Sequence, residues 1–362
     1  ILACVFSMLA PVCAKQFVNL TPLPKQMTVG EGQFRFSKSY TVGAALLPDS
    51  LQAEAVRFMD VIQETTGCKG KLSKSKKADI RMTVDKSIAY EGYRLSVTKK
   101  NVNISASSAR GFFYAFQTLK KIMPANVMAE LSVVDAQKVL PWFKTTKRPE
   151  IPCVEIDDEP RFWYRGFMLD CGRHFFTVDE IKHILDGLAI YKFNYFHWHL
   201  TENQAWRLQS KIFPMLNDSV NMTRMPGKYY TLEEARELAD FCKRHHVLLI
   251  PEIDMPGHSA AFVRTFRHDM QSPEGMKILK LLIDEVCETF DEVPYLHIGT
   301  DEVHFKNPHF VPEMVSYIRA KGKKVISWNP GWNYKPGEID MMQLWSFRGK
   351  GTPGIPAIDS KY

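Results

Sequence analysis

The second half of the chain alternates between short apolar runs and amphipathic stretches of helical period. From Phe162 onward, the apolar runs are rich in β-branched and aromatic residues and are separated by segments with helical spacing. Apolar strands that alternate with helices indicate a parallel sheet covered on both faces. The predicted strands are residues 167–170, 194–200, 247–253, 295–299, 325–328, 341–345 and 355–358.

This rhythm favours a (β/α)8 barrel of the TIM type over a dinucleotide-binding sheet, because no glycine-rich phosphate loop follows the first strand. Capping boxes at Thr177-x-x-Glu180 and Thr231-x-x-Glu234 predict the starts of two of its helices. Seven strands would leave an unpaired, apolar barrel edge. We therefore expect that the sequence stops before the last strand of an α/β barrel.

Residues before about 150 show a different pattern, in which short β-type runs are separated by turn residues. Helical stretches at 50–66 and 110–122 interrupt these runs. The pattern predicts a small α+β domain with helices on one face of a sheet. Because the segment from Thr145 to Pro160 combines prolines with alternating charge, we predict domains of residues 15–150 and 151–362.

Residues 1–14 resemble the remnant of a secretory signal peptide. They carry no charge, are mostly apolar and end in Val-Cys-Ala before Lys15. A buried N-terminal strand is the alternative, with Pro11 against it. The sequence lacks an initiator Met and a basic region, so we expect a clipped start and a secreted or periplasmic protein. The other cysteines, Cys68, Cys153, Cys171, Cys242 and Cys287, show no CxxC spacing, which argues against a disulfide framework or a zinc ribbon.

The charge pattern argues against two classes of partner. The net charge is +7, but lysines and arginines are scattered, and the densest group, Lys69–Lys77, contains no aromatic residue. We interpret that group as a solvated loop and expect no nucleic-acid partner. No run of about twenty apolar residues is present, so no membrane span is predicted.

Charged and polar residues collect at the carboxyl ends of the predicted barrel strands. Between Tyr295 and Val303, an apolar strand ends directly in Asp301 and Glu302. In a (β/α)8 barrel this end of a strand faces the mouth of the active site. The other strand ends contribute Asp170, Arg173, His174, His197, Trp198, His199, Glu202, Asn203, Glu252, Asp254, His258, Trp328 and Trp345. Apolar strands do not need these groups for packing, so we predict a catalytic site there.

Some of these residues allow two interpretations. His197 and His199 project to the same side of a strand and are either metal ligands or satisfied core histidines. Trp328 and Trp345 either fill the barrel or form walls on which a sugar ring stacks. Arg173 is either an exposed residue at a helix entry or a donor to a polyhydroxylated ligand.

Four segments that occur in this order resemble glycoside hydrolase family 20, the β-N-acetylhexosaminidases. The resemblance extends from about residue 20 to the end and includes the small domain that precedes the barrel in that family. The segments are Arg165-Gly-Phe-Met-Leu-Asp-Cys-Gly-Arg-His-Phe175, Phe196-His-Trp-His-Leu-Thr-Glu-Asn-Gln204, Pro251-Glu-Ile-Asp-Met-Pro-Gly-His-Ser259 and His297-Ile-Gly-Thr-Asp-Glu-Val303.

The resemblance implies an exo-acting, retaining hydrolase in which the substrate supplies the nucleophile. Glu302 then protonates the leaving glycosidic oxygen and later deprotonates the incoming water. Asp301 holds the 2-acetamido group of the substrate while the carbonyl oxygen of that group closes an oxazolinium ring. The implied partner is a glycan with a terminal β-linked N-acetylhexosamine, and no metal or other cofactor is implied.

Further roles follow from the same resemblance. His258 matches a histidine that contacts the acid, and Glu202 matches the carboxylate behind it. Arg173 matches an arginine that holds the 3- and 4-hydroxyls of the sugar. The residues that match the acetamido pocket are Trp328, Trp345 and Tyr362.

The chain departs from the family pattern at several points. Thr300 stands where a second glycine is usual, and Glu202 is one methylene longer than the usual aspartate. The family's eighth-strand region supplies a further tryptophan and an acid, and neither is present here. We therefore expect residues 1–362 alone to be unstable or inactive.

Two other classes of function stay open from the residues alone. A metal-dependent TIM-barrel hydrolase would use His197 and His199, although in amidohydrolase-type barrels such a pair ends the first strand and here it ends the second. A non-catalytic glycan-binding protein would not need an adjacent proton donor. The preference for GlcNAc or GalNAc and the oligomeric state are not indicated by the sequence.

Overall fold

The structure, a computed structural model, describes residues 18–124 and 148–361. The chain divides into two compact units, residues 1–161 and 162–362. Tyr362 and the proposed signal segment lie outside the described residues. Within the described part of the chain, no helix has the length and apolarity needed to cross a bilayer, and Cys68, Cys153, Cys171, Cys242 and Cys287 are free and buried.

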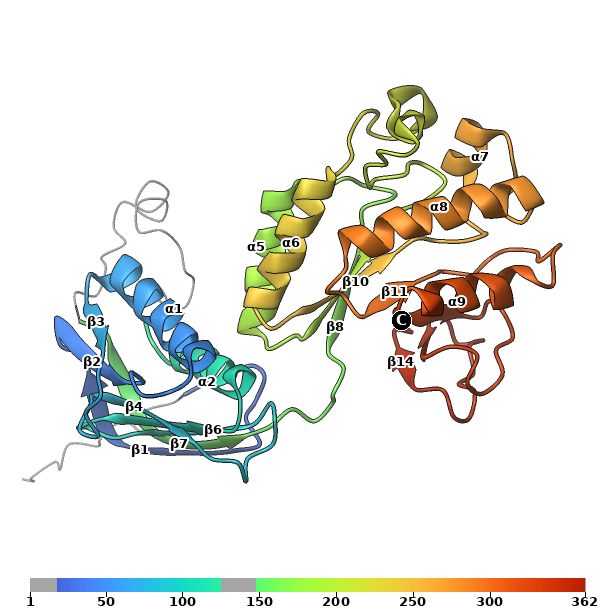
Figure 1. Cartoon of the computed structure of the whole chain (residues 1–362). Coiled ribbons are helices and arrows are strands. Elements are labelled where there is room, and N and C mark those ends of the chain that lie inside the picture. Colours follow the sequence, from blue (N-terminus) through green and yellow to red (C-terminus); the bar gives the residue numbers. More distant parts are fainter. Residues whose placement is uncertain (1–17, 125–147, 362) are drawn as a thin grey trace, which may run out of the picture. The chain divides into compact units, whose positions relative to one another are not determined.

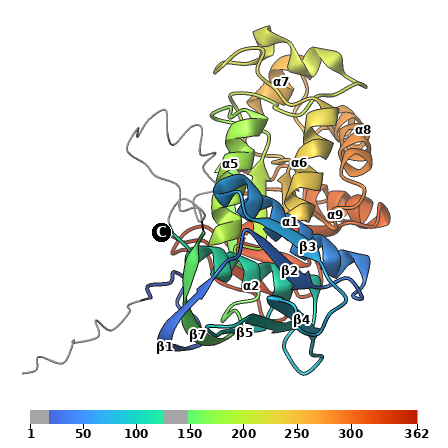
Figure 2. The ribbon, with the colours of Figure 1, turned by 90° about the vertical axis from the view of Figure 1, so that its left-hand side faces the viewer.

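The N-terminal unit is a seven-stranded mixed sheet in the order β1-β7-β5-β6-β4-β2-β3. Helices α1 and α2 lie on the same face of this sheet (Figures 1 and 2), which confirms the predicted α+β arrangement. The elements are β1 (Gln26–Arg35), β2 (Ser39–Gly43), α1 (Asp49–Thr66), β3 (Lys69–Leu72), β4 (Ile80–Val84), β5 (Tyr93–Val97), β6 (Val102–Ala106), α2 (Ala109–Lys121) and β7 (Glu150–Asp158).

Local sequence explains the two helices of this unit. Ser108 caps α2, because its side-chain oxygen accepts a hydrogen bond from the Gly111 amide at 3.1 Å. Helix α1 ends at Gly67, which adopts a left-handed φ of 73° without the steric cost of a Cβ. The helices meet where Phe58 stacks on Phe116 with ring centroids 4.6 Å apart. Apolar helix faces thus cover the sheet, as the pattern predicts.

The predicted domain boundary at 150/151 is wrong by about one strand. Residues 150–158 form β7, which lies between β1 and β5 in the N-terminal sheet and pairs antiparallel with both. Its pairing partners are distant in sequence, so the local prolines and charges gave a misleading signal. The Lys69–Lys77 segment was likewise predicted as loop throughout, but its start forms β3, an edge strand on which lysines remain exposed.

The C-terminal unit contains a seven-stranded parallel sheet in consecutive order, β8 to β14, as expected for a (β/α)8-type barrel (Figure 1). Its elements are β8 (Gly166–Asp170), α5 (Val178–Ile190), β9 (Tyr195–His199), the 3-10 turns Pro214–Asn217 and Ser219–Asn221, α6 (Leu232–Arg244), β10 (Leu248–Glu252), α7 (Ala260–Phe266), α8 (Pro273–Thr289), β11 (Tyr295–His297), α9 (Phe310–Ala320), β12 (Lys324–Asn329), β13 (Met341–Leu344) and β14 (Ala357–Asp359).

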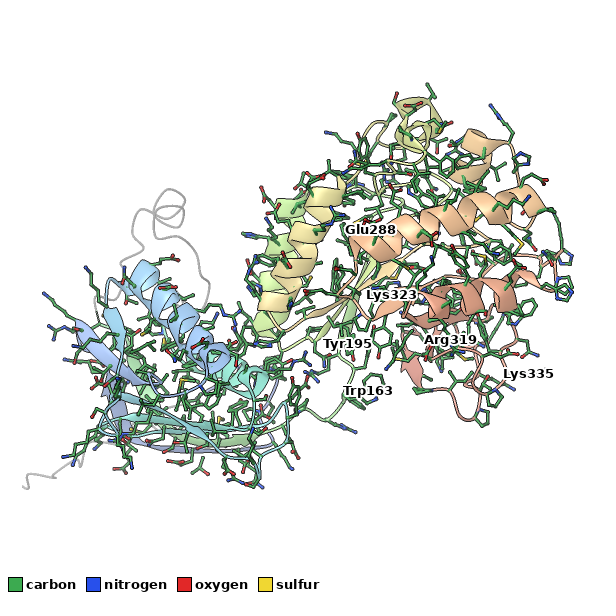
Figure 3. All side chains as sticks on the ribbon, in the orientation of Figure 1. Trp163, Tyr195, Glu288, Arg319, Lys323 and Lys335 are labelled. Atoms are coloured by element: carbon green, nitrogen blue, oxygen red, sulfur yellow. The ribbon has the colours of Figure 1, made fainter. Side chains whose placement is uncertain are left out.

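The two helix starts predicted for this unit are confirmed. Both capping boxes form, with Thr177 and Thr231 each bonded reciprocally to the glutamate three residues later. Just after the C-terminal end of α8, the buried Lys323 donates to the carbonyl oxygens of Phe290, Asp291 and Val293 at 2.6–2.8 Å (Figure 3). A cation there satisfies carbonyls near the negative end of the helix dipole.

The register of the parallel strands aligns the polar residues near their carboxyl ends. His199 lies opposite both Asp170 on β8 and Glu252 on β10, and Glu252 lies opposite His297 on β11. A large apolar cluster, which includes the fully buried Phe196 and Trp198, packs between the sheet and its helices. The sheet thus carries a layer of charged and polar side chains at the carboxyl ends of its strands.

Candidate active site

Asp301 and Glu302 lie on a tight turn directly after β11. Gly299, Thr300 and Glu302 have positive φ angles of 65°, 84° and 50°. The side chain of Asp301 is 16% exposed, whereas that of Glu302 is 57% exposed. One carboxylate is therefore recessed and its neighbour is open to solvent, so the two acids are placed for different tasks.

His258 links both acids to a third carboxylate. Its Nε2 lies 3.6 Å from Asp301 Oδ2 and 3.6 Å from Glu302 Oε2, and its Nδ1 lies 3.0 Å from Glu202 Oε1. Interactions with Asp301 and Glu202 outweigh the effect of burial and raise the pKa of His258 to about 10. The imidazole is thus positively charged at neutral pH and sits between the acids.

Glu202 is the buried anchor of this arrangement. Burial alone would raise its pKa, but His199 at 3.5 Å, together with hydrogen bonds from His258 and the Asn203 amide, lowers the pKa to about 2. Glu202 also pairs with Arg173, whose guanidinium lies 2.8 Å from its Oε2 and 2.6 Å from Asp170 Oδ2. The side chain of Arg173 remains 43% exposed, so it can donate outward to a ligand.

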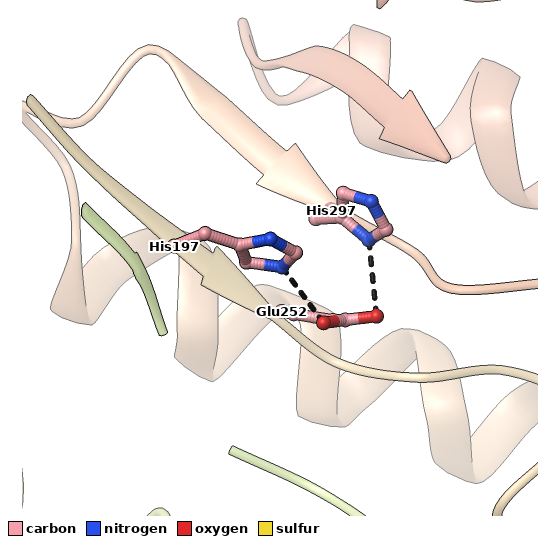
Figure 4. A group of neighbouring side chains, drawn as sticks. All are labelled: His197, Glu252 and His297. Atoms are coloured by element: carbon pink, nitrogen blue, oxygen red, sulfur yellow. Dashed lines mark hydrogen bonds and ion pairs between the residues drawn. The ribbon is translucent and has the colours of Figure 1, made fainter. Parts of the chain in front are cut away.

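A second layer of polar residues lies beneath the rim and converges on Glu252, which is completely buried (Figure 4). Its Oε2 is 2.7 Å from His197 Nε2 and 2.6 Å from His199 Nδ1. Its Oε1 accepts a hydrogen bond from Trp328 Nε1 at 2.7 Å and lies 3.1 Å from His297 Nδ1. His197 and His199 are thus buried histidines that share Glu252 as a partner, while His197 Nδ1 and His199 Nε2 have no hydrogen-bond partner among the described residues.

Charge in this buried layer is divided unevenly. Burial opposes ionisation of Glu252, but nearby His199, His297 and His197 hold its pKa well below the usual value. Burial lowers the pKa of His197 to about 4, so this ring is neutral at pH 7. For His199, Glu252 and Glu202 overcome burial and hold the pKa well above its usual value. The central ion pair is therefore between Glu252 and His199.

Asp254 differs from the carboxylates around it. Burial, reinforced by the charges of Glu252 and Asp301, raises its pKa well above the usual range. Its backbone amide donates to Thr201 Oγ1 at 2.9 Å, while its side chain packs against Gly299. A Cβ at residue 299 would lie 1.7 Å from Asp254 Oδ1, so this close approach requires glycine. Burial thus favours the protonated form of Asp254 beneath the catalytic turn.

Within the described residues, three groups bring potential metal ligands within 4.8 Å of one another: His197-Glu252-His297, His199-Glu202-Asp254 and Asp254-His258-Asp301. The first is already an internal hydrogen-bonded network, since three N–H donors from His197, His199 and Trp328 converge on Glu252 (Figure 4). The second and third groups share Asp254, whose raised pKa favours the protonated form, and contain histidines that lie beside carboxylates. Four atoms of these two groups, His199 Nε2, Glu202 Oε2, Asp254 Oδ1 and Asp301 Oδ1, have no hydrogen-bond partner among the described residues. The raised pKa values of His199 and His258 favour protonated rings, which repel a cation, so the donor sets do not favour a metal.

The two predicted tryptophans occupy different environments. Trp328 is 6% exposed, and its ring lies edge-on to His297 with centroids 4.7 Å apart. Trp345 is partly exposed, donates to the Pro330 carbonyl at 2.8 Å and borders a cavity of about 770 Å³ beside Glu302. Their roles as walls of an acetamido pocket stay predictions. Tyr362, the third residue predicted for that pocket, is outside the described residues.

The structure thus gathers Arg173, Glu202, His258, Asp301 and Glu302 into one connected group. Sequence reasoning named Glu252 and Asp254 as strand-end residues but gave them no role, and it did not single out His297. A signal was present, because these residues stand at matching ends of adjacent predicted strands. Converting that signal into contacts requires the strand register.

Comparison with known proteins supports one family for both units. The profile described as glycosyl hydrolase family 20, domain 2, matches residues 18–159, and that of the family's catalytic domain matches residues 162–271. Beta-hexosaminidases from Porphyromonas gingivalis and Vibrio furnissii are 32% and 33% identical over 375 and 262 residues, which cover 86% and 62% of this chain. The chain spans 45% and 40% of the length of these relatives.

A solved structure agrees with the sequence comparisons. The beta-hexosaminidase of Streptomyces plicatus, a mutant in complex with the product GlcNAc, superposes with a TM-score of 0.76 at 26% identity. The similarity covers 91% of this chain and 69% of that one. Matching profiles over both units, similar sequences and a similar fold lead to one conclusion: the chain belongs to glycoside hydrolase family 20.

Proposed function

We propose that the protein is an exo-acting, retaining β-N-acetylhexosaminidase that releases terminal β-linked GlcNAc or GalNAc from glycans. The observation that carries this proposal is the pairing of a recessed Asp301 with an exposed Glu302, both 3.6 Å from the charged His258. The names of the relatives, and the GlcNAc bound to the Streptomyces plicatus protein, support the same substrate class.

In the first step, Glu302 donates a proton to the glycosidic oxygen as the bond to C1 breaks. The carbonyl oxygen of the substrate's own 2-acetamido group attacks C1 and forms an oxazolinium ring. Asp301 accepts a hydrogen bond from the acetamido N–H and stabilises the positive charge that develops there. Asp301 Oδ1 is buried and has no hydrogen-bond partner among the described residues, which suits an acceptor for that N–H.

In the second step, the deprotonated Glu302 takes a proton from water, and the water oxygen attacks C1 and opens the ring. Two displacements at C1 retain its configuration. His258 supports both steps, because its positive charge faces the two acids while Glu202 holds the opposite edge of its ring. The exposed cavity beside Glu302 and Trp345 is placed to receive the leaving part of the glycan.

The test is hydrolysis of chromogenic N-acetyl-β-glucosaminide and N-acetyl-β-galactosaminide by the full-length protein. We expect turnover of at least one substrate, with a β-configured sugar as the first product in NMR spectra. Inactivity on both substrates, together with binding of either sugar, would favour the glycan-binding alternative.

Metal removal distinguishes the proposal from a metal-dependent hydrolase. After dialysis against a chelator, we expect kcat and KM to be unchanged, because Glu252 and its histidines bind one another and the reaction needs only carboxylates and the substrate's acetamido group. A loss of activity that is reversed by adding zinc or another divalent ion would contradict this expectation.

Replacing Arg173 by lysine tests its proposed contact with the sugar. A lysine cannot reproduce the planar donor group that reaches Asp170 and Glu202 while also offering donors outward. We expect KM to rise on the order of 10- to 100-fold, as for the loss of hydrogen bonds to a charged group, with a smaller effect on kcat. Arg319→Lys, which changes an exposed arginine on α9 paired with Asp340, is the matched control. An unchanged KM for Arg173→Lys would remove Arg173 from the sugar site.

We also propose that the protein is exported, on the basis of the uncharged, apolar residues 1–14. Expression of the full gene with its native start, followed by N-terminal sequencing of the mature protein, tests this proposal. Mature protein that retains these residues and stays inside the cell would overturn it.

A further inference from the structure

The turn that carries the two acids has an unusual residue at its centre. Thr300 adopts φ +84°, in the left-handed region, although its side chain is β-branched. Such residues rarely adopt this conformation, and it persists only where the surrounding structure enforces it. Thr300 is completely buried, so other protein groups surround its side chain. Groups that contact Thr300 must therefore stabilise its positive φ.

A cluster of three buried hydroxyl groups surrounds this position. Ser327 Oγ lies 2.6 Å from Thr300 Oγ1 and donates to the Gly299 carbonyl at 2.7 Å. Tyr334 donates its hydroxyl proton to Ser327 Oγ at 2.7 Å and lies 3.4 Å from Thr300 Oγ1. A serine hydroxyl has one proton and two acceptor positions. Ser327 therefore donates to Gly299 and accepts from Thr300 and Tyr334, which satisfies all three side chains.

The backbone of the turn is held on the same side. The Gly299 carbonyl also accepts the Trp328 amide at 2.9 Å, and the Gly299 amide donates to His297 Nδ1 at 3.1 Å. Thr300 is thus bonded to β12 through its side chain, and Gly299 is bonded to β12 through its main chain. Any shift of this turn moves Asp301 and Glu302 relative to His258.

We propose that Ser327 and Tyr334, acting through Thr300, are positioning residues that hold the Gly299–Glu302 turn and thereby set the placement of Asp301 and Glu302 for reaction. This inference rests on the proposed hexosaminidase function for its consequence in catalysis, but the placement itself can be measured without substrate. In this chain, hydroxyl contacts stabilise a positive φ at residue 300, which a glycine there would adopt without a steric cost.

The decisive test compares Ser327→Ala and Thr300→Val with the double variant Ser327→Ala/Thr300→Gly in the full-length protein. Both single changes remove a hydroxyl and keep the β-branch at residue 300, so the strained turn loses its restraint. We expect kcat to fall on the order of 10- to 100-fold with KM within about threefold, because small misplacements of reacting groups have effects of this size. Tyr334→Phe is expected to have a smaller effect in the same direction.

The double variant distinguishes positioning from general damage. Glycine adopts a positive φ without a steric penalty, so adding Thr300→Gly to Ser327→Ala should recover about tenfold in kcat relative to Ser327→Ala alone. Ser316→Ala is the matched control, since it removes the hydroxyl of an exposed serine on α9 in the same unit. Thermal unfolding of each variant shows whether loss of activity merely follows loss of folded protein.

The pKa of His258, measured by NMR titration of its ring, reports the placement without any substrate. Asp301, Glu202, Asp254 and Glu302 face this ring, and Asp301 makes the largest contribution to raising its pKa to about 10. We expect a lower pKa in Ser327→Ala and a value near wild type in the double variant. If these shifts occur but the wild type hydrolyses neither chromogenic substrate, the positioning role of Ser327 is supported and the proposed hexosaminidase activity is contradicted.

Wild-type kcat and an unchanged His258 pKa in both Ser327→Ala and Thr300→Val would overturn the inference. It would also be overturned if Thr300→Gly gave no recovery of kcat or of the His258 pKa in the Ser327→Ala background, because the hydroxyl cluster would then serve only to fill the core.

Discussion

Glu302→Gln is expected to lower kcat on an N-acetylhexosaminide by about 10²- to 10⁴-fold, the range for loss of a general acid–base group. The amide has nearly the same shape as the carboxylic acid but cannot transfer the proton. Because the Glu302 side chain is 57% exposed and its contact with His258 is long, at 3.6 Å, the change should leave folding intact. Steady-state kinetics of the purified variant, with thermal unfolding to confirm the fold, measure this effect.

The leaving group makes this experiment specific to proton donation. A dinitrophenolate leaves without protonation, whereas a sugar hydroxyl requires a proton as the glycosidic bond breaks. The loss of kcat/KM should therefore be at least tenfold greater for a GlcNAc disaccharide than for the dinitrophenyl glycoside. Glu288→Gln, the same chemical change at an exposed site on α8 (Figure 3), is the control. Equal losses on both substrates would show that Glu302 is not the acid.

The fold of the C-terminal unit could be predicted well because its signals are local. Each parallel strand is a continuous apolar run, and Thr177 and Thr231 mark two helix starts within four residues of sequence. The N-terminal sheet was harder, because its order interleaves strands that are far apart in the chain. Residues 150–158 pair with residues 26–35 and 93–97, and nothing in their own composition identifies these partners.

The same distinction applies to the site. Residues on the rim, such as Arg173, His258 and Glu302, could be found because motifs preserve their spacing within single strand-to-helix connections. The buried layer depends instead on register across β9, β10, β11 and β12, which brings Glu252 against partners 45 to 76 residues away in sequence. Thr300 shows the limit clearly. The sequence identifies it as a departure from glycine, but only the structure reveals the hydroxyl groups of Ser327 and Tyr334 around it.

The two layers have separate physical tasks. In the rim, charges alternate in sign from Asp170 through Arg173 and Glu202 to His258 and the acid pair, and all of these groups except Glu202 remain partly exposed. In the buried layer, Glu252 and His199 form an ion pair that is enclosed by neutral His197 and Trp328. Glu252 is the last residue of β10, and the chain continues directly from it to Asp254 and His258. Stability of the buried layer should therefore control the geometry of the rim.

Glu252→Gln is therefore expected to produce a large loss of stability, about 3–5 kcal/mol, as when one partner of a buried ion pair is removed. Glutamine has a similar volume, but it removes the nearest counter-charge of His199, leaving Glu202 at 3.5 Å, and it introduces an N–H₂ group where His197, His199 and Trp328 already donate. Urea unfolding monitored by tryptophan fluorescence measures the effect in the correct unit, because six of the seven tryptophans follow residue 162. Glu288→Gln again provides the control.

The pH dependence of this loss gives a second, independent test. Glu252 has a folded pKa well below its unfolded value of about 4.3, so its contribution to stability is present above that pH and is lost as the pH falls through the folded pKa. His199 has a folded pKa well above its unfolded value of about 6.5, so its contribution is present below that pH and is lost as the pH rises through the folded pKa.

The difference in unfolding free energy between wild type and Glu252→Gln should therefore be greatest between about pH 4.3 and 6.5, where both contributions are fully present. It should shrink at more acidic pH as Glu252 is protonated, and at alkaline pH as His199 loses its proton. A difference that stays below about 1 kcal/mol at pH 5.5, the size of an ordinary hydrogen bond, would contradict the assignment of an ion pair. A large difference that does not vary with pH would instead assign the loss to disrupted packing around a neutral Glu252.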